Sequence, residues 1–442
     1  MRTPIDDLFE FLRFPSVSTE PAHQRDVAAC ADWLVRKFHS MGLAAETHAT
    51  PGHPIVVARS AAQPGKRTVL IYGHYDVQPV DPVAEWTHPP FEPVVVDGRI
   101  FARGSTDNKG QILAHILGVE ATLQESGELP VNVIFVVEGE EEIGSNNLEP
   151  FLKAHSAELV CDAVAISDTG MIAPGYPTFT YGLRGITALE VRVKGPATDL
   201  HSGNFGGAVA NPATALARLV ATLHDADGRV AVEGFYDDVA LPADWELEAW
   251  KKLPVQDADF LALTGAPELF GEAGFSTLER LWSRPTVEVN GIGGGFQGEG
   301  SKTVIPREAF VKLTCRLVPH QDPEKIESLV RRHLESHAPR GVKVVVEGGH
   351  YAQPFLVDPL TPFGMAAQRA LHRTFGEIPA MIREGGSIPI TRVFTEVLNA
   401  PVLMLGLADP DCRAHAPDEN LPVANFENGI RLNQLLLEEL AK

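Results

Sequence analysis

Three short apolar runs in this chain each stop at a histidine or a carboxylate. The runs and the polar groups that follow them are residues 68–73 with His74 and Asp76, 131–137 with Glu138, and 161–166 with Asp168. Apolar runs of this length, bounded by polar turns, predict buried strands. Ligands collect at the carboxyl ends of the strands in an open α/β sheet. The pattern therefore predicts a sheet edge that gathers an imidazole and several carboxylates, a set suited to a divalent cation.

Helical spacing alternates with these strands at both ends of the chain, which predicts an α/β fold with a mostly parallel sheet covered by helices. Between the two ends the pattern changes to that of a smaller α+β domain with an antiparallel sheet. We expect one catalytic domain built from 1–183 and 354–442, with a domain at 184–353 inserted into it. Residues 225–285 give mixed signals and are left unassigned. Other expected elements are strands at 186–193, 309–318, 342–346 and 401–407, and helices at 212–223, 323–336, 361–374 and 425–440.

Charge and cysteine usage exclude several classes of protein. The formal net charge of −21 argues against a nucleic-acid partner, because phosphate binding needs a basic surface. No run approaches the about 18 apolar residues of a membrane helix, and the first residues lack the apolar region of a signal peptide. The four cysteines are scattered without a paired motif, as is typical of reduced thiols. We expect a soluble, cytoplasmic protein that does not bind a membrane.

The first candidate ligand is His74. It stands two positions before Asp76, and side chains at this spacing share one face of an extended strand. The histidine can then bind a metal while the aspartate orients its ring. A single His-x-Asp pair is also common in surface loops, so the pair alone does not define a site.

Further carboxylates and a second histidine extend the set. Asp107 precedes a helix, where it could be an N-cap or could bridge two cations. Glu141 and Glu142 could divide the roles of ligand and general base, or belong to a solvated charge run. Asp168 and His415 each follow an apolar run and singly would be structural. Together, two histidines and three carboxylates suit zinc, with manganese or cobalt as substitutes.

Four motifs, in order along the chain, resemble those of the di-zinc exopeptidases. This family includes aminoacylase, succinyl-diaminopimelate desuccinylase, glutamate carboxypeptidase and carnosine dipeptidase. The motifs are Gly-His-Tyr-Asp-Val-Gln-Pro at 73–79, Gly-Ser-Thr-Asp-Asn-Lys-Gly at 104–110, Glu-Glu-Glu-Ile-Gly-Ser at 140–145 and Asp-Leu-His-Ser-Gly at 199–203. Residues 302–306, 316–319 and 383–389 are similar to signatures of the carnosine and cytosolic non-specific dipeptidase branch.

The resemblance implies a role for each candidate. His74 and Asp168 would hold one metal, and Glu142 and His415 the other. Asp107 would bridge the two cations, which we expect to be zinc, with manganese or cobalt as alternatives. Asp76 would orient His74. Glu141 would be the general base of a reaction in which a metal-bridging hydroxide attacks the amide bond of a dipeptide.

The resemblance also implies a dimer and a set of substrate contacts. The inserted domain would act as a lid and as the interface of a homodimer, in which His201 reaches the active site of the partner subunit. Substrate contacts would come from His201, Thr303, Arg316, His350 and Ser387. Arg316 could pair with the terminal carboxylate of the substrate, or be an ordinary surface arginine. An N-acyl-amino-acid deacylase or desuccinylase that uses the same site is the alternative function.

Overall fold

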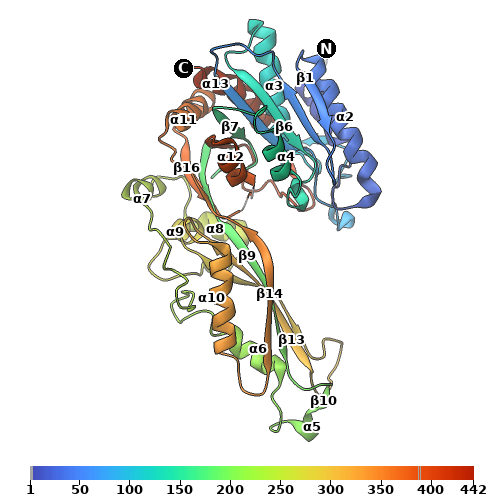
Figure 1. The fold of residues 1–442 in the computed structure, drawn as a ribbon, viewed down its shortest axis with the longest axis vertical. Helices are drawn as coiled ribbons and strands as arrows, with labels where there is room; N and C mark the ends of the chain where they lie inside the picture. Colours follow the sequence, from blue (N-terminus) through green and yellow to red (C-terminus); the bar gives the residue numbers. More distant parts are fainter. Residues whose placement is uncertain (1–2, 387, 389) are drawn as a thin grey trace.

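The protein consists of two parts stacked along its long axis (Figure 1). The structure, a computed structural model, describes residues 3–386, 388 and 390–442. The upper part carries a nine-stranded sheet with helices around it, and the elongated lower part carries a four-stranded sheet. Both ends of the chain lie in the upper part. The predicted α/β class with a second, smaller α+β region is confirmed.

The upper sheet is parallel at its centre, where β6, β3, β7 and β17 run side by side in one direction. Antiparallel neighbours, β2 on one side and β8 on the other, continue the sheet outwards. The strands, in sheet order, are β1 (Ala44–His48), β2 (Ile55–Arg59), β6 (Asn132–Glu138), β3 (Thr68–His74), β7 (Ala163–Ile166), β17 (Val402–Gly406), β8 (Thr178–Leu183) and β15 (Phe355–Leu356), and β16 (Ala380–Glu384) also pairs with β8.

Alternate residues of the central strands enter two different cores. In β3, Val69 and Ile71 belong to the core under α1, α2, α3, α11 and α13, whereas Leu70 and Tyr72 belong to the core under α4 and α12. Burial on both faces explains why these strands are continuous apolar runs in the sequence. The helices are α1 (Pro4–Leu12), α2 (Gln24–Ser40), α3 (Lys109–Ser126), α4 (Leu148–His155), α11 (Pro362–Phe375), α12 (Ile390–Leu398) and α13 (Val423–Leu440).

The lower sheet is antiparallel, in the order β11-β13-β9-β14. Inward and outward residues alternate along β9 and β13, because the helices α6 and α10 cover one face only. The elements are β9 (Gly185–Lys194), β11 (Thr286–Gly294), β13 (Glu308–Leu317), β14 (Lys343–Ala352), α6 (Pro212–Val220) and α10 (Pro323–Ser336). At the far tip lie β10 (Leu200–His201), α5 (Ser202–Phe205) and β12 (Val304–Ile305).

The unassigned segment 225–285 contains three short helices, α7 (Asp244–Trp250), α8 (Asp257–Thr264) and α9 (Thr277–Ser283). Although the segment lies between β9 and β11 in sequence, Trp250, Leu253 and Trp282 are part of the core of the nine-stranded sheet. The segment thus leaves the lower part, packs on the upper sheet and returns. No helix among the described residues is long and apolar enough to cross a membrane.

Candidate metal centre

Four neighbouring strands of the upper sheet deliver the candidate ligands to one edge. His74 is the last residue of β3, and Asp168 follows the end of β7 by two positions. Glu141 and Glu142 open the short 3-10 helix η3 (Glu141–Ile143) just beyond β6. The remaining ligands come from loops: Asp107 precedes α3, and His415 follows β17. Parallel central strands explain why residues so far apart in sequence meet at this edge.

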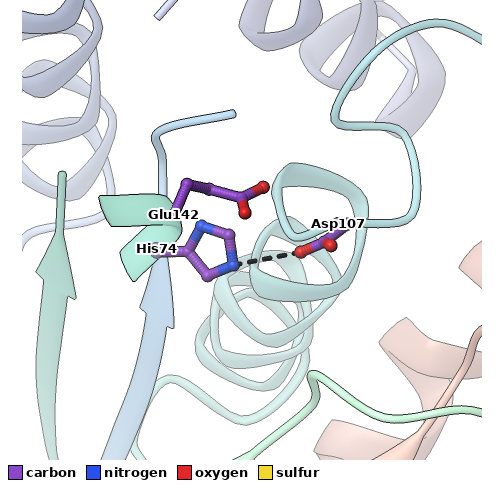
Figure 2. Close-up of side chains that lie close together, drawn as sticks. All are labelled: His74, Asp107 and Glu142. Atoms are coloured by element: carbon purple, nitrogen blue, oxygen red, sulfur yellow. Dashed lines mark ion pairs between the residues drawn. The ribbon is translucent and has the colours of Figure 1, made fainter. Parts of the chain in front are cut away.

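The first cluster surrounds the imidazole of His74, whose side chain is fully buried. Its Nε2 lies 3.1 Å from Asp107 Oδ1 and 3.7 Å from Asp168 Oδ1. Figure 2 shows the Asp107 carboxylate facing this nitrogen, with the Glu142 carboxylate beside the ring. One ligand atom from each of His74, Asp107 and Glu142 lies within 4.8 Å of the others.

The second cluster uses the other oxygen of Asp107. His415 Nε2 lies 2.8 Å from Asp107 Oδ2 and 3.3 Å from Glu142 Oε2. Gln78 donates a hydrogen bond of 2.7 Å to the same Glu142 oxygen. The two oxygens of Asp107 therefore face two separate groups of ligands.

A second layer of polar groups fixes these side chains. His74 Nδ1 lies 3.1 Å from the backbone oxygen of Asp76 and 3.4 Å from its carboxylate. The same carboxylate accepts the backbone N–H groups of Glu141 at 3.2 Å and Glu142 at 3.1 Å. Asp76 thus orients a histidine ring and one turn of backbone at once. Asn108 completes the layer by donating to Asp168 Oδ1 at 2.8 Å.

The charges of the two clusters act strongly on one another. Burial lowers the pKa of His74, but hydrogen bonds to Asp107 and Asp168 outweigh burial and raise the pKa well above its usual value. Hydrogen bonds to Asp107 and then Glu142 raise the pKa of His415 to about 10. Burial raises the pKa of Glu141 well above its usual value, and the charges of Asp168 and Asp107 add to this effect. Carboxylates crowd together here, and like charges at such short range raise one another's pKa.

This arrangement fits divalent cations. Among the described residues, Glu142 Oε1 is a buried polar atom without a hydrogen-bond partner, and the buried His74 Nε2 faces only carboxylate oxygens. Buried polar atoms are normally satisfied, so both point to a missing ligand. Two imidazoles and three carboxylates form a donor set that suits zinc, and manganese and cobalt also accept such ligands.

Two functional candidates were missed by the sequence analysis. Glu419 is fully buried, and its carboxylate accepts the N–H groups of Gly104, Thr106 and Asp107 at 2.9–3.0 Å while pairing with Arg103 at 2.7 Å. It holds the loop that carries Asp107. Its partners are more than 300 positions away, so no local spacing could identify it.

The second missed candidate is Glu384, the last residue of β16. Its Oε1 accepts the N–H of Gly170 at 3.0 Å. Burial, joined by the charge of Asp168, raises its pKa to about 7. The sequence analysis included this residue in a signature but gave it no role. The structure places it as an additional acid at the edge of the metal centre.

The predicted substrate contacts that fall on described residues lie outside the two clusters. His201 and Thr303 meet at the far tip, where Thr303 Oγ1 lies 3.5 Å from His201 Nε2 (Figure 1, at β10). Arg316 is in β13 and His350 in β14, at positions that pair with Ile186 and Ala188 of β9. Ser387 falls outside the described residues.

The mixed α/β fold and this donor set together are those of a metal-dependent hydrolase. The chain belongs to the peptidase family M20/M25/M40, whose family model matches residues 70–439. It is 34% identical over 443 residues to the Cys-Gly metallodipeptidase dug1 of Schizosaccharomyces pombe, with 97% of this chain and 93% of that protein covered. It is 32% identical over 456 residues to the Beta-Ala-His dipeptidase of Homo sapiens, at 99% and 90% coverage.

A solved structure is similar over the whole length. The M20 family metallo-carboxypeptidase Sso-CP2 of Sulfolobus solfataricus matches with a TM-score of 0.87 and 33% identity, and all of both chains is covered. The predicted resemblance to the di-zinc exopeptidases and to their dipeptidase branch is confirmed.

Proposed function

We propose that this protein is a dipeptidase that hydrolyses the amide bond of dipeptides with two divalent metal ions. The observation that carries the proposal is the division of the Asp107 carboxylate between the cluster of His74 and the cluster of His415. The relatives named as dipeptidases support a small peptide as the substrate. We assign His74 and Asp168 to one cation, Glu142 and His415 to the other, and Asp107 to both.

The chemistry divides between the metals and the chain. When bound, the cations would polarise the scissile carbonyl and acidify water. We propose zinc, with manganese or cobalt as alternatives. Glu141 takes the proton of the attacking water and returns it to the leaving amine. Its Oε2 lies 4.0 Å from His74 Nε2, which places the carboxylate inside the site. We assign it as the base rather than as a ligand because the resemblance implies that role. Burial raises the pKa of Glu141 above its usual value, which is the direction that favours accepting a proton.

We further propose that residues 184–353 form the lid and the interface of a homodimer, and that 1–183 and 354–442 form the catalytic domain. His201 and Thr303 sit at the end of the molecule opposite β6 and β7 (Figure 1). This placement supports a role for His201 in the active site of a partner subunit, where it would stabilise the developing oxyanion. Arg316, close enough to the half-buried Arg184 for their charges to interact, is assigned to the terminal carboxylate of the substrate. His350 and Ser387 remain predicted substrate contacts.

We also infer a cytoplasmic location. The four cysteines, Cys30, Cys161, Cys315 and Cys412, are free thiols, as expected in a reducing compartment.

The test is hydrolysis of a panel of free dipeptides, tripeptides, and N-acetyl and N-succinyl amino acids, with zinc or manganese added. Turnover of free dipeptides that is lost with a chelator and regained with metal supports the proposal. Turnover of only the acylated compounds would indicate that the protein is a deacylase that uses the same site. Nothing in the described part of the chain favours that second function. Preferential turnover of the longer peptides would instead indicate a carboxypeptidase.

A further inference from the structure

A helix from the middle of the sequence packs against the sheet that carries the metal centre. The helix α7 lies between β9 and β11 in sequence, yet it sits beside β16 (Figure 1). Its Trp250 contributes to the core that includes Tyr181 of β8 and Ile382 of β16. The lid sequence is therefore anchored to the catalytic sheet at a point other than its two ends.

A buried ion pair forms the centre of this contact. Glu246 of α7 and Arg383 of β16 are only 5% and 6% exposed. Glu246 Oε1 accepts the Nε–H of Arg383 at 3.0 Å, a second bond from its Nη2, and the hydroxyl of Tyr181 at 2.6 Å. Glu246 Oε2 accepts the N–H of Ala243 at 2.7 Å, which caps the helix. The Arg383 guanidinium also lies 5.5 Å from the ring centre of Trp250.

The residues that follow Arg383 lead directly to the metal centre. Glu384 bonds to Gly170, which is two positions after the proposed ligand Asp168. Gly385 approaches Arg184 so closely that an added Cβ would lie 2.7 Å from its guanidinium. The pairing of β16 with β8 shifts register between Ile382 and Arg383. Beyond the shift, Arg383 and Glu384 still pair with Gly182 and Leu183, and the backbone oxygen of Glu384 accepts the Arg184 N–H at 3.1 Å. Side-chain contacts therefore add to an irregular ladder at this end of the strand.

We propose that Glu246 is a positioning residue for the metal centre, acting through Arg383 on residues 384–386. This inference rests on the proposed function, because it takes the end of β16 as a wall of the substrate site. Removing the Glu246 charge leaves the Arg383 guanidinium buried without its partner, a state that side chains and backbone move to relieve. A shift of about 1 Å in a positioning element can cost about 100-fold in rate.

The chain contains a matched control. Glu272 pairs with Arg284 at 2.8 Å through both oxygens, and the hydroxyl of Tyr236 lies 3.4 Å away. Its side chain is 10% exposed, against 6% for Glu246. Both acids belong to the same inserted segment and both hold an arginine and a tyrosine. Within the described part of the chain, no hydrogen bond or ion pair joins the Glu272 and Arg284 side chains to β16 or to the proposed metal ligands.

The experiment compares Glu246→Gln with Glu272→Gln in the metal-loaded protein. We expect Glu246→Gln to raise KM for a dipeptide by about tenfold or more, with the wild-type metal content retained. Deuterium uptake of peptides covering 380–386 should also become faster. Glu272→Gln should change neither quantity. If Glu246→Gln does not fold, Arg383→Lys, which keeps the charge and loses the planar fork, should show the same two effects.

Wild-type KM and wild-type uptake in the Glu246→Gln protein would overturn the proposal. Equal changes in the Glu272→Gln protein would overturn it as well, because they would indicate general destabilisation. If the wild-type protein cleaves no dipeptide, the proposed function fails. The deuterium uptake of the two variants would still decide whether Glu246 holds the end of β16.

Discussion

Glu419 holds the proposed bridging residue Asp107 through its backbone: Glu419 Oε1 accepts the Asp107 N–H at 3.0 Å. The Asp107 side chain is therefore free to present both oxygens to the two histidines. Glu419 also pairs with the buried Arg103, so one carboxylate both accepts the N–H groups of the loop and balances the charge of the arginine. The Glu419 side chain thus contacts a proposed metal ligand at one point, the backbone N–H of Asp107.

We expect Glu419→Gln to lower the melting temperature and to weaken metal binding by about 10–100-fold, the usual cost of losing a partner behind the ligands. Arg103 would remain buried without a counter-charge. Calorimetry and metal titration would measure both effects. Glu439→Gln is the control, since Glu439 of the C-terminal helix α13 pairs with the half-exposed Arg369 of α11 and not with a proposed metal ligand or its loop. Unchanged metal affinity in Glu419→Gln would contradict the assigned role.

The sequence points to the proposed metal ligands more readily than to the residues that support them. Strands buried on both faces have continuous apolar sequences. The polar residues that follow these sequences, including His74 and Asp168, can therefore be identified from the sequence alone. Glu419 and Glu384 could not be found in this way, because their partners lie hundreds of positions away. The helices in 225–285 are too short to give a clear period, and tertiary packing on the upper sheet sets their positions.

The general base can be separated from its acidic neighbours. Glu141→Gln should lower kcat by about 100–10,000-fold, the range for losing a general base, while metal content stays at the wild-type level. Glu140→Gln is the matched control from the same acidic run, because Glu140 bonds instead to the His53 N–H at 2.9 Å and to Asn147 at 2.7 Å. Turnover retained by Glu141→Gln, or metal lost from it, would exclude Glu141 as the base.

The metal-free protein should become less stable as the pH rises. Burial raises the pKa of Glu138 to about 7, from the 4.5 of an unperturbed glutamate. A carboxyl with a raised pKa in the folded state contributes stability below pH 4.5 and loses it as the pH rises through about 7. His415, with its pKa raised to about 10, has the same sign between 6.5 and 10.

We therefore expect the melting temperature of the chelated protein to fall progressively from pH 5 to pH 8. The free energy of unfolding should decrease by up to about 3 kcal/mol from Glu138 alone. Glu138→Gln should flatten this dependence, since the amide does not titrate. Bound metal should also flatten it by compensating the carboxylates. A melting temperature of the chelated protein that rises over this range would contradict the assigned signs.

Subunit mixing tests whether His201 acts on the partner subunit. His201→Ala and Glu141→Gln should each be inactive as homodimers. After subunit exchange, the mixed dimer has one site that combines an intact Glu141 with an intact His201 from the other chain. Activity should therefore return in the mixture. If His201 served its own chain, mixing would restore nothing, and a monomer in solution would exclude the arrangement outright.

Glu384 is the acid best placed to distinguish a free substrate amine from an acylated one. Its Oε1 accepts the N–H of Gly170, which stands two positions after the proposed ligand Asp168, and the charge of Asp168 acts on the carboxyl. An ammonium group beside Glu384 and Asp168 would gain a charge-assisted contact that an N-acetyl group cannot form. Glu384→Gln should accordingly raise KM for free dipeptides and leave KM for any N-acetylated substrate unchanged. Steady-state kinetics on matched free and acetylated substrates would measure the difference. An equal change in KM for the free and the acetylated substrates would indicate that Glu384 holds the Gly170 backbone and does not bind the substrate amine.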